Sequence, residues 1–220
     1  MAYKISLIGA TGLVGQHCLE QLLNSDFVES VQVLSRRPLT VEHPKLQVTV
    51  CDFEALESVR EALICDALIS CLGTTIKQAG SQASFYRVDH DYVVEAANLA
   101  RQQGCRLATV ISAVGADPNS GVFYNRTKGE MERSLEALDF ASLNLVRPSL
   151  LLGDRGEKRL AEDIGKPFMR AIAPAMIGPL RKYRPIEGRQ VARAIVATLD
   201  ANEVGLRYIY PSDEIYPSNE

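Results

Sequence analysis

The sequence predicts an α/β protein built on a doubly wound parallel sheet, with helices on both faces and a small C-terminal cap. Short apolar runs alternate with longer amphipathic runs along most of the chain, which favours repeated parallel βαβ units. Several apolar runs contain almost no polar residue, as is typical of strands that are covered on both faces. A glycine-rich turn joins the first apolar run to the first amphipathic one.

The strands and helices can be assigned in chain order from these periodicities. Seven strand-like segments span residues 3–9, 31–35, 46–52, 66–73, 107–115, 141–149 and 206–211. Five helical segments lie between them, at residues 14–23, 53–64, 84–103, 122–138 and 189–200. The chain shows no internal repeat or linker, so residues 1–220 are expected to form a single domain with one substantial core.

Residues 151–190 interrupt the alternation. The stretch 166–185 contains four prolines and no regular strand pattern. Ligands of an open α/β sheet bind outside the carboxyl ends of the strands, so we expect residues 151–190 to form a small substrate cap over that crevice. A peripheral loop and helix with no contact to substrate is the alternative.

Composition excludes several classes of function. A net charge of −3 provides no general attraction to nucleic acid or to anionic membranes. No apolar stretch approaches the roughly 18 residues of a spanning helix, and the start of the chain lacks the apolar region of a signal peptide. We therefore expect a cytoplasmic protein with no nucleic-acid or membrane partner. The five cysteines and three histidines show no metal-ligand spacing, so reduced thiols and no metal site are expected.

Three glycines follow the first strand at intervals of three residues. This pattern predicts a tight turn, close approach of the backbone to a pyrophosphate and close packing of helix on strand, as in dinucleotide-binding folds of the Rossmann type. The amino end of the helix then offers unpaired N–H groups to the phosphates. A turn without a ligand is the alternative. The expected cofactor contacts in this turn are Gly9, Thr11, Gly12, Leu13, Val14 and Gly15.

The end of the second strand predicts which dinucleotide is bound. A protein that binds NAD usually places Asp or Glu here for the ribose hydroxyls, whereas this chain has Ser35, Arg36 and Arg37. Guanidinium groups form charge-assisted, forked hydrogen bonds with phosphate. The sequence therefore favours NADPH (NADP) over NADH, the alternative being a solvated arginine pair.

Two further strand ends are expected to reach the same ligand. Asp52 ends the third strand, where its carboxylate could accept from the adenine amino group or could equally cap the helix that follows. The fourth strand ends in a glycine and a threonine that would let the backbone approach the dinucleotide. The residues expected to do so are Cys71, Leu72, Gly73 and Thr74.

A tyrosine and a lysine in the fourth helical segment suggest proton transfer. Tyr124 and Lys128 are four residues apart, which places both side chains on one helix face. The ammonium can then favour the phenolate of a tyrosine whose ordinary pKa is about 10, so that Tyr124 exchanges a proton with a substrate carbonyl or alcohol. Ser112 ends the fifth strand, and its hydroxyl can hydrogen-bond the same oxygen. The alternative is structural: a strand-end serine and a half-buried tyrosine.

These motifs resemble those of the short-chain dehydrogenase/reductase superfamily, in its atypical, NAD(P)-binding branch. The chain is similar in particular to the HIV-Tat-interacting-protein type of oxidoreductase, over nearly its whole length. The segments that carry the similarity are GATGLVG (9–15), LGTTIKQAGSQASFYRVDHDYVVEAANLA (72–100), SAVGAD (112–117), YNRTKGEMERSLEAL (124–138) and RPSLLLGDR (147–155).

The resemblance implies a Rossmann domain that binds NADPH. It implies that Tyr124 is the acid/base, that Lys128 holds both this tyrosine and the nicotinamide ribose, and that Ser112 orients the substrate. The loop after the sixth strand is implied to approach the nicotinamide through Pro148, Ser149 and Leu150.

Two positions depart from the pattern of the family. Many relatives carry a second hydroxyl after the strand-end serine, where this chain has Ala113, so Ser112 is the only candidate. Many extended relatives have an active-site asparagine in the fourth helix of their fold. This chain has Asp89 at that place, within the segment 84–103. Neighbouring residues on a helix point to different faces, so we expect residues 89–91 to lie on an ordinary solvated helix face.

Three functions are compatible with these features, and the first is favoured. It is an NADPH-dependent oxidoreductase of the carbonyl reductase or alcohol dehydrogenase type, acting on a small-molecule carbonyl or alcohol. The second is an NADPH-binding regulatory protein without turnover that contacts a protein partner. The third is a sugar-nucleotide epimerase, which the arginine pair and the short chain disfavour. The chain could act as a monomer or a homodimer.

Overall fold

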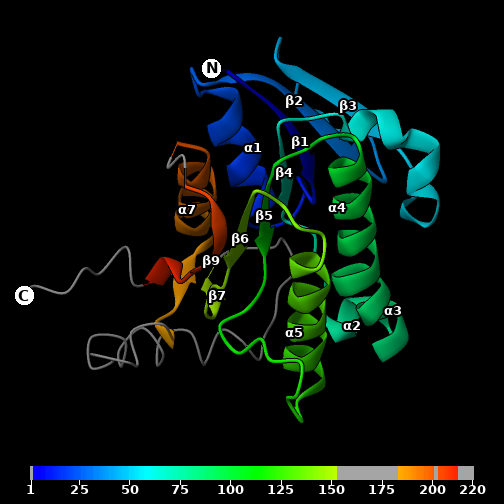
Figure 1. Ribbon diagram of the computed structural model, residues 1–220, viewed down its shortest axis with the longest axis vertical. Helices are drawn as coiled ribbons and strands as arrows, with labels where there is room; N and C mark the ends of the chain where they lie inside the picture. The colour runs from blue at the N-terminus through cyan, green and yellow to red at the C-terminus, as the bar shows by residue number, and fades with distance from the viewer. Residues whose placement is uncertain (1, 153–182, 201–202, 213–220) are drawn as a thin grey trace, which may run out of the picture.

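One seven-stranded sheet forms the centre of the computed structural model, which describes residues 2–152, 183–200 and 203–212 (Figure 1). Its strand order is β3-β2-β1-β4-β5-β6-β9, and all neighbouring strands are parallel. The strands are β1 (Tyr3–Ile8), β2 (Val28–Ser35), β3 (Leu46–Val50), β4 (Ala67–Ser70), β5 (Leu107–Ile111), β6 (Ser142–Val146) and β9 (Gly205–Ile209). Each overlaps a segment predicted from the sequence, so the doubly wound sheet is confirmed.

The direction of strand addition reverses between β1 and β4. From β1 the chain adds β2 and β3 toward one edge, and it then returns to β4, from which β5, β6 and β9 lead to the other edge. At the reversal Ile8 lies opposite Ser70, and the N–H of Cys71 donates to the carbonyl of Ile8 at 2.9 Å. The ligand crevice of an open parallel sheet lies at such a reversal, and the glycine turn begins there.

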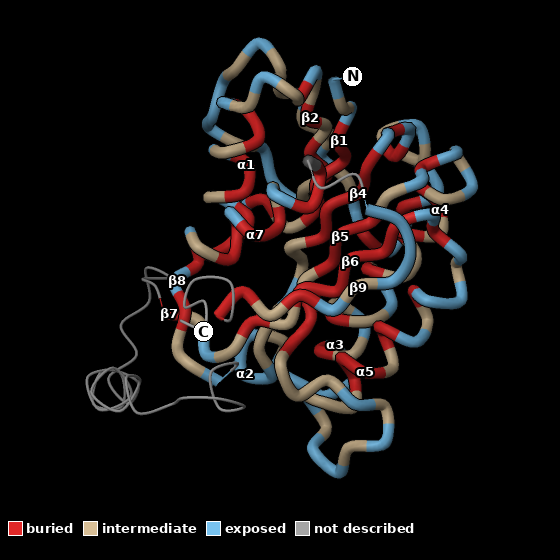
Figure 2. The backbone as a smooth tube through the Cα atoms, turned by 60° about the vertical axis from the view of Figure 1, so that its left-hand side comes forward, coloured by how far each residue is buried: buried red, intermediate tan, exposed pale blue. Residues whose placement is uncertain are grey.

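Helices cover both faces of the sheet (Figures 1 and 2). The helices α1 (Gly15–Leu23) and α7 (Gly188–Asp200) contribute to one buried cluster, and η1 (Phe53–Leu63), α4 (Tyr92–Gln102) and α5 (Phe123–Glu136) contribute to the other. Between β4 and α4 the chain forms α2 (Ile76–Ala79), α3 (Gln82–Tyr86) and η2 (Arg87–Asp91). The sheet is therefore sandwiched, as its nearly continuous apolar strands predict.

Strand residues alternate between the two buried clusters. Leu7 packs into the α1 and α7 cluster, and Ile8 packs into the cluster on the opposite face. Both side chains are completely buried, and burial of such a side chain contributes about 1.5–3 kcal/mol. Figure 2 shows the strands β4 and β6 buried along their length and β5 buried in its middle. The core thus holds the strand ends of the candidate site in place.

The segment 53–64 differs from the expected α-helix. It forms the 3₁₀ helix η1, which is broken at Ala55 and Val59, where the backbone angles are not helical. The hydroxyl of Ser58 donates to the carbonyl of Ala55 at 2.7 Å, and such side-chain bonds compete with the regular helical ladder.

The segment 84–103, expected as one regular helix, contains a turn of π-helix. Residues 82–102 are helical throughout as α3, η2 and α4, and η2 is the wider π turn. Wider turns of this kind are frequent at functional sites. A π turn shifts the residues before and after it relative to one another around the helix axis, so the face on which Asp89 lies could not be read from a period of 3.6 residues.

The expected cap, residues 151–190, falls mainly on residues 153–182, which lie outside the described part of the chain. At its two ends β7 (Leu151–Leu152) pairs in parallel with β8 (Ile186–Glu187), although no strand was expected there. Two residues per strand are too few for a period-2 pattern, so sequence periodicity cannot detect them. The last residues of the range begin α7, which packs on α1.

Candidate active site

The turn after β1 packs tightly against the end of β4. Gly9 has φ +80°, and a Cβ at this position would overlap the carbonyl carbon of Cys71. A Cβ on Gly15 would overlap the carbonyl oxygen of Gly9, so α1 can start here only with glycine. Two of the three glycines are therefore required by the packing of the protein itself, as the turn predicts.

Gly12 is different, and its surroundings fit a bound dinucleotide. A Cβ on Gly12 would meet its nearest protein atom, the oxygen of Gly9, at an ordinary 3.4 Å. Gly12 and Thr11 are both exposed, and the amino end of α1 has no side-chain cap and no acidic residue in its first turn. The protein's own packing thus leaves space at the amino end of α1, which is where phosphates bind in dinucleotide-binding folds.

Leu13 and Val14 lie in the same turn but point elsewhere. Both side chains are buried, and Val14 belongs to the cluster beneath α1 and α7. A Cβ on Gly188 would lie 2.9 Å from the carbonyl oxygen of Leu13, so the turn also abuts the start of α7. The cofactor contacts predicted for Leu13 and Val14 therefore rest on their backbone groups.

The ends of β2 and β3 form an open depression of about 400 Å³, lined by Arg36, Val50, Cys51 and Asp52. Arg36 and Arg37 are exposed, and the N–H of Arg37 donates to the Ser35 hydroxyl at 3.3 Å. Asp52 accepts from the N–H of Glu54 at 3.0 Å and so caps η1, which was one of its two expected roles. The structure thus brings the predicted ribose and adenine residues to one place.

The loop after β4 lies across the reversal from the glycine turn. Cys71 and Leu72 pack partly into the two cores, and Gly73 is exposed. The N–H of Thr74 donates to a carboxylate oxygen of Asp89 at 2.8 Å. A Cβ on Gly73 would lie 3.2 Å from the other oxygen of Asp89, so this loop lies directly against the aspartate.

Lys128 reaches the end of β5 next to Ser112, and Tyr124 precedes it on the same helix. The Nζ atom of Lys128 donates to the carbonyl of Ile111 at 3.5 Å, one residue before Ser112. Ser112 is 2% exposed, and its hydroxyl has no hydrogen-bond partner among the described residues. Tyr124 lies one helical turn before Lys128, is 38% exposed, and packs on the ring of Phe85 at 5.7 Å between centroids. A buried hydroxyl left unpaired by the protein suits a ligand oxygen.

The expectation that Asp89 lies on a solvated helix face is wrong. Its Oδ1 atom pairs with Nζ of Lys128 at 2.8 Å, and the two side chains are only 2% and 3% exposed. His90 instead hydrogen-bonds the exposed Asp91 and Ser134 at 2.8 and 3.1 Å. The π turn η2 accounts for the difference. The sequence contained one indication that Asp89 is not an ordinary surface residue: it stands where many extended relatives have an active-site asparagine.

The buried ion pair keeps Lys128 charged. Burial alone lowers the pKa of a lysine, but the negative charge of Asp89, with smaller contributions from Tyr124 and Glu132, raises the pKa of Lys128 above its ordinary value. A raised folded-state pKa means that the stabilisation from this pair is fully present at neutral pH. It is lost only as the pH rises through the pKa of the folded state.

The loop after β6 is held by the protein's own hydrogen bonds. The carbonyl of Pro148 accepts from the N–H of Val114 at 3.1 Å, and the hydroxyl of Ser149 donates to the carbonyl of Arg184. Leu150 is 52% exposed. Contacts of Ser149 with a nicotinamide, as the resemblance implies, would therefore involve its backbone more readily than its hydroxyl.

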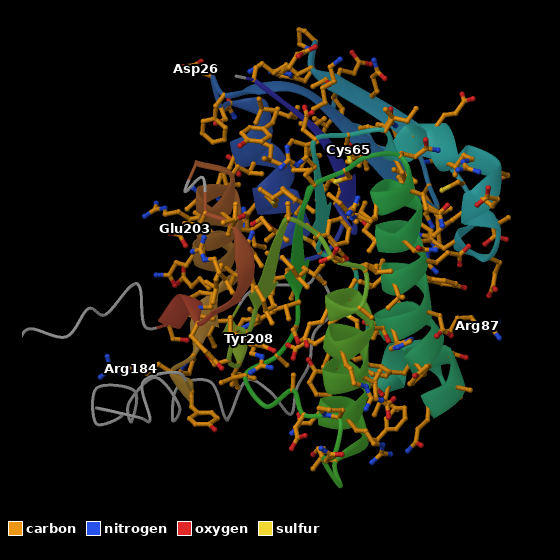
Figure 3. The ribbon with its side chains drawn as sticks, in the orientation of Figure 1. Asp26, Cys65, Arg87, Arg184, Glu203 and Tyr208 are labelled. Carbon is orange, nitrogen blue, oxygen red and sulfur yellow. The ribbon has the colours of Figure 1, made fainter. Side chains whose placement is uncertain are left out.

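A second charged pair, which the sequence did not predict, anchors the same helix. Glu132 of α5 accepts from Nε of Arg147 at 2.9 Å and also pairs with Nη2. The guanidinium donates to the hydroxyl of Tyr210 at 3.1 Å and lies 4.1 Å from the ring centroid of Tyr208, which is labelled in Figure 3.

The described residues contain no cluster of His, Cys, Asp and Glu that could hold a metal ion, nor any helix long and apolar enough to cross a bilayer.

The fold resembles that of MoeE5 in its complex with UDP-glucose and NAD. The TM-score is 0.70 at 17% sequence identity, over 93% of this chain and 74% of that one. At this identity the likeness establishes the fold alone. It is a Rossmann-type fold.

Two relatives are much more similar in sequence. Rat (Rattus norvegicus) HTATIP2 is 36% identical over 77% of this chain and 71% of its own length. The protein FMP52, mitochondrial, of Eremothecium gossypii is 32% identical over 95% of this chain and 94% of its own length.

The mitochondrial name contradicts the expectation of a cytoplasmic location, and further fungal relatives carry the same name. That expectation was wrong because it rested only on the lack of an apolar signal peptide region and of an apolar spanning helix in the sequence. Mitochondrial targeting segments are amphipathic and rich in arginine and serine, so a search for apolar signals does not detect them.

The family is established by sequence as well as by fold. A family model described as NAD(P)H-binding matches residues 9–202, a range that includes the glycine turn, the arginine pair and the residues at the end of β5. The chain therefore belongs to the NAD(P)H-binding family, in the branch of the short-chain dehydrogenase/reductase-like superfamily that includes HTATIP2 and FMP52.

Proposed function

We propose that this protein is an NADPH-dependent oxidoreductase that reduces a small carbonyl compound or oxidises the corresponding alcohol. The observation that supports the proposal is an unpaired buried hydroxyl next to the residue that Lys128 contacts at the end of β5. The hydroxyl of Ser112 is buried without a partner among the described residues, the buried Lys128 contacts the carbonyl of the preceding residue, Ile111, and Tyr124 lies one helical turn before Lys128 with a 38% exposed side chain.

Each side chain has a distinct role in this reaction. NADPH, when bound at the glycine turn, would supply the hydride for the carbonyl carbon. Tyr124 transfers its phenolic proton to the carbonyl oxygen, which becomes the alcohol, and solvent later restores the proton. The ammonium of Lys128 stabilises the phenolate that remains. Ser112 donates a hydrogen bond to the same oxygen and so holds the carbonyl in place.

The preference for NADPH rests on the depression at the ends of β2 and β3. Arg36 lines it and Arg37 follows at once, while the end of β2 carries no carboxylate. Two guanidiniums at this place favour a 2′-phosphate over a ribose hydroxyl. Asp52 lies in the same depression, where its capping bond to Glu54 leaves carboxylate lone pairs for an adenine amino group.

The test is NADPH consumption with a panel of aldehydes, ketones and quinones, on wild type and on Tyr124→Phe. We expect turnover to fall by about 10²-fold or more in Tyr124→Phe, while the Kd for NADPH stays unchanged. The matched control is Tyr92→Phe, which removes a hydroxyl bonded to Glu54 on the surface and should leave turnover intact.

Two outcomes would contradict the proposal. Full activity of Tyr124→Phe on a substrate that wild type reduces would remove Tyr124 from its role. Tight NADPH binding by wild type, with no consumption across the panel, would instead favour a regulatory protein that binds the cofactor without turnover and contacts a protein partner.

A further inference from the structure

Two cysteines that are far apart in sequence lie together at the amino end of the sheet. Cys65 stands two residues before β4, and Cys105 stands two residues before β5. The first residues of these strands, Ala67 and Leu107, are register partners. Neighbouring strands lie about 4.8 Å apart, which is within the range of Cα separations that a disulfide spans. We propose that Cys65 and Cys105 are a redox-active thiol pair, which hydrogen peroxide oxidises to a disulfide.

The sulfur of Cys105 is held against the chain beside Cys65. It donates to the carbonyl of Asp66, the residue after Cys65, at 3.6 Å and to the carbonyl of Leu107 at 3.2 Å. The Cys105 thiol also hydrogen-bonds the side chain of Cys65. Both side chains belong to the buried cluster formed with η1, α4 and α5, and both carry free thiols. The two thiols are therefore in contact before any oxidation.

The two thiols differ in exposure and in acidity. Cys65 is 9% exposed, and Cys105 is completely buried. The hydrogen bond from Cys105, with a smaller contribution from Ser6, lowers the pKa of Cys65 in spite of its burial. The contact with Cys65, together with burial, raises the pKa of Cys105. Because the thiolate is the nucleophilic form of cysteine, Cys65 is the thiol that attacks the peroxide and Cys105 is the thiol that resolves the product.

The oxidation balances with one molecule of hydrogen peroxide. The Cys65 thiolate attacks one peroxide oxygen and the O–O bond breaks, which gives a sulfenic acid. The hydroxide that leaves takes up the proton that Cys65 had released and becomes water. The sulfur of Cys105 then attacks the sulfur of Cys65 and the S–O bond breaks, so that a second hydroxide leaves with the proton of Cys105 as water. The two electrons that the thiols lose reduce the peroxide.

The pair lies at the opposite end of the sheet from the candidate active site. Cys65, labelled in Figure 3, precedes β4, whereas the proposed cofactor loop follows the same strand. The disulfide joins the chain before β4 to the chain before β5, and the residues proposed to bind NADPH lie at the carboxyl ends of the strands. This modification is therefore independent of the proposed reaction.

The other cysteines provide internal controls. Cys18 of α1, which is completely buried, also contacts the side chain of Cys71. That contact and burial raise the pKa of Cys71 well above its ordinary value. Cys51 is a partly buried thiol whose pKa is raised by burial and by the neighbouring Asp52. Both comparisons lack an activated thiolate, so we expect these three cysteines to react more slowly than Cys65.

The experiment treats the reduced protein with increasing amounts of hydrogen peroxide. The remaining thiols are alkylated under denaturing conditions, and peptide mass spectrometry locates the products. We expect Cys65 and Cys105 in one cross-linked peptide pair that has lost two hydrogen atoms. This disulfide should form at least about tenfold faster than Cys51 is oxidised, while Cys18 and Cys71 remain open to alkylation.

Two variants test the order of attack. Cys105→Ser keeps a hydrogen-bond donor beside Cys65 but cannot close the disulfide, so Cys65 should stop at the sulfenic acid, which dimedone traps. Cys65→Ser should leave Cys105 reduced, because the Cys105 thiol is buried and protonated. The matched control is Cys18→Ala, which should form the disulfide as wild type does. If Cys105→Ser does not fold by circular dichroism, Cys105→Ala removes the same thiol and must still yield trapped Cys65.

Three outcomes overturn the proposal. The first is a folded wild type in which Cys65 is oxidised no faster than Cys51. The second is an equally fast disulfide between Cys18 and Cys71. The third is sulfenic acid that accumulates on Cys65 of wild type without a disulfide. None of these measurements uses NADPH or a substrate, so their result is separate from that of the proposed reaction.

Discussion

The proposed preference for NADPH depends on Arg36 and Arg37. Both are exposed at the end of β2, and Arg36 lines the depression that also contains Asp52. An exposed guanidinium costs little to desolvate, so a phosphate can recruit it without breaking an existing buried pair. Removal of the two arginines should therefore change the proposed preference for NADPH without destabilising the fold.

This separation makes a prediction for Arg36→Ala/Arg37→Ala. Hydrogen bonds to charged groups contribute about 1.5–3 kcal/mol each, so the Kd for NADPH should rise at least about tenfold, while the Kd for NADH changes little. Fluorescence titration with both cofactors measures the two constants. The control is Arg60→Ala/Arg193→Ala, which removes a partly buried arginine of η1 that pairs with Glu57 and an exposed arginine of α7. Tighter binding of NADH than of NADPH by wild type would refute the preference.

At the scale of elements, α5 connects the candidate site to the sheet. Lys128 and Glu132 lie one turn apart on its buried face, the first paired with Asp89 of η2 and the second with Arg147 of the loop after β6. Gly129 lies between them, and a Cβ there would overlap the backbone of Pro118. The helix is thus held against three separate segments, which fixes the buried face that carries Lys128 and Glu132.

The pair of Glu132 and Arg147 should therefore contribute measurably to stability. Arg147→Met leaves the buried carboxylate of Glu132 without its partner, and loss of one member of a buried pair costs about 3–5 kcal/mol. Glu132→Leu/Arg147→Met removes both charges and should recover most of that loss. Urea unfolding followed by circular dichroism gives the free energies. Equal destabilisation of the single and double variants would show that the charge pairing is not what matters.

At the scale of the whole molecule, the candidate site is assembled from the carboxyl ends of parallel strands. The glycine turn, the arginine pair, the loop after β4 and the Ser112 region follow β1, β2, β4 and β5, which lie on both sides of the strand reversal. A cofactor bound across this edge would contact the folded protein at points far apart in sequence. It would bind the unfolded chain weakly.

Cofactor binding should therefore raise the thermal stability of the protein. A ligand at 100 times its Kd stabilises the native state by about 2.7 kcal/mol, which for a chain of this size raises Tm by about 5–10 °C. Differential scanning fluorimetry with equal concentrations of NADPH and NADH should show the larger increase with NADPH. No increase with either cofactor would contradict the assignment of the glycine turn to dinucleotide binding.

Much of this organisation was predictable from local patterns. The seven strands follow from short apolar runs, and the glycine turn and the Tyr124 and Lys128 pair follow from spacings of three and four residues. The breaks in η1 and the π turn η2 were not predictable, because they depend on side-chain bonds and packing that override helix periodicity. The orientation of Asp89 was missed for the same reason.

The sequence by itself determined the doubly wound sheet, the family and the residues that are candidates for cofactor and substrate, since these depend on residues close together in the chain. Only the tertiary structure decided which charges meet. Asp89 and Lys128, and Glu132 and Arg147, come from different elements. Their pairing depends on how helices and strand ends pack around the sheet, and burial there makes each pair strong enough to position the site.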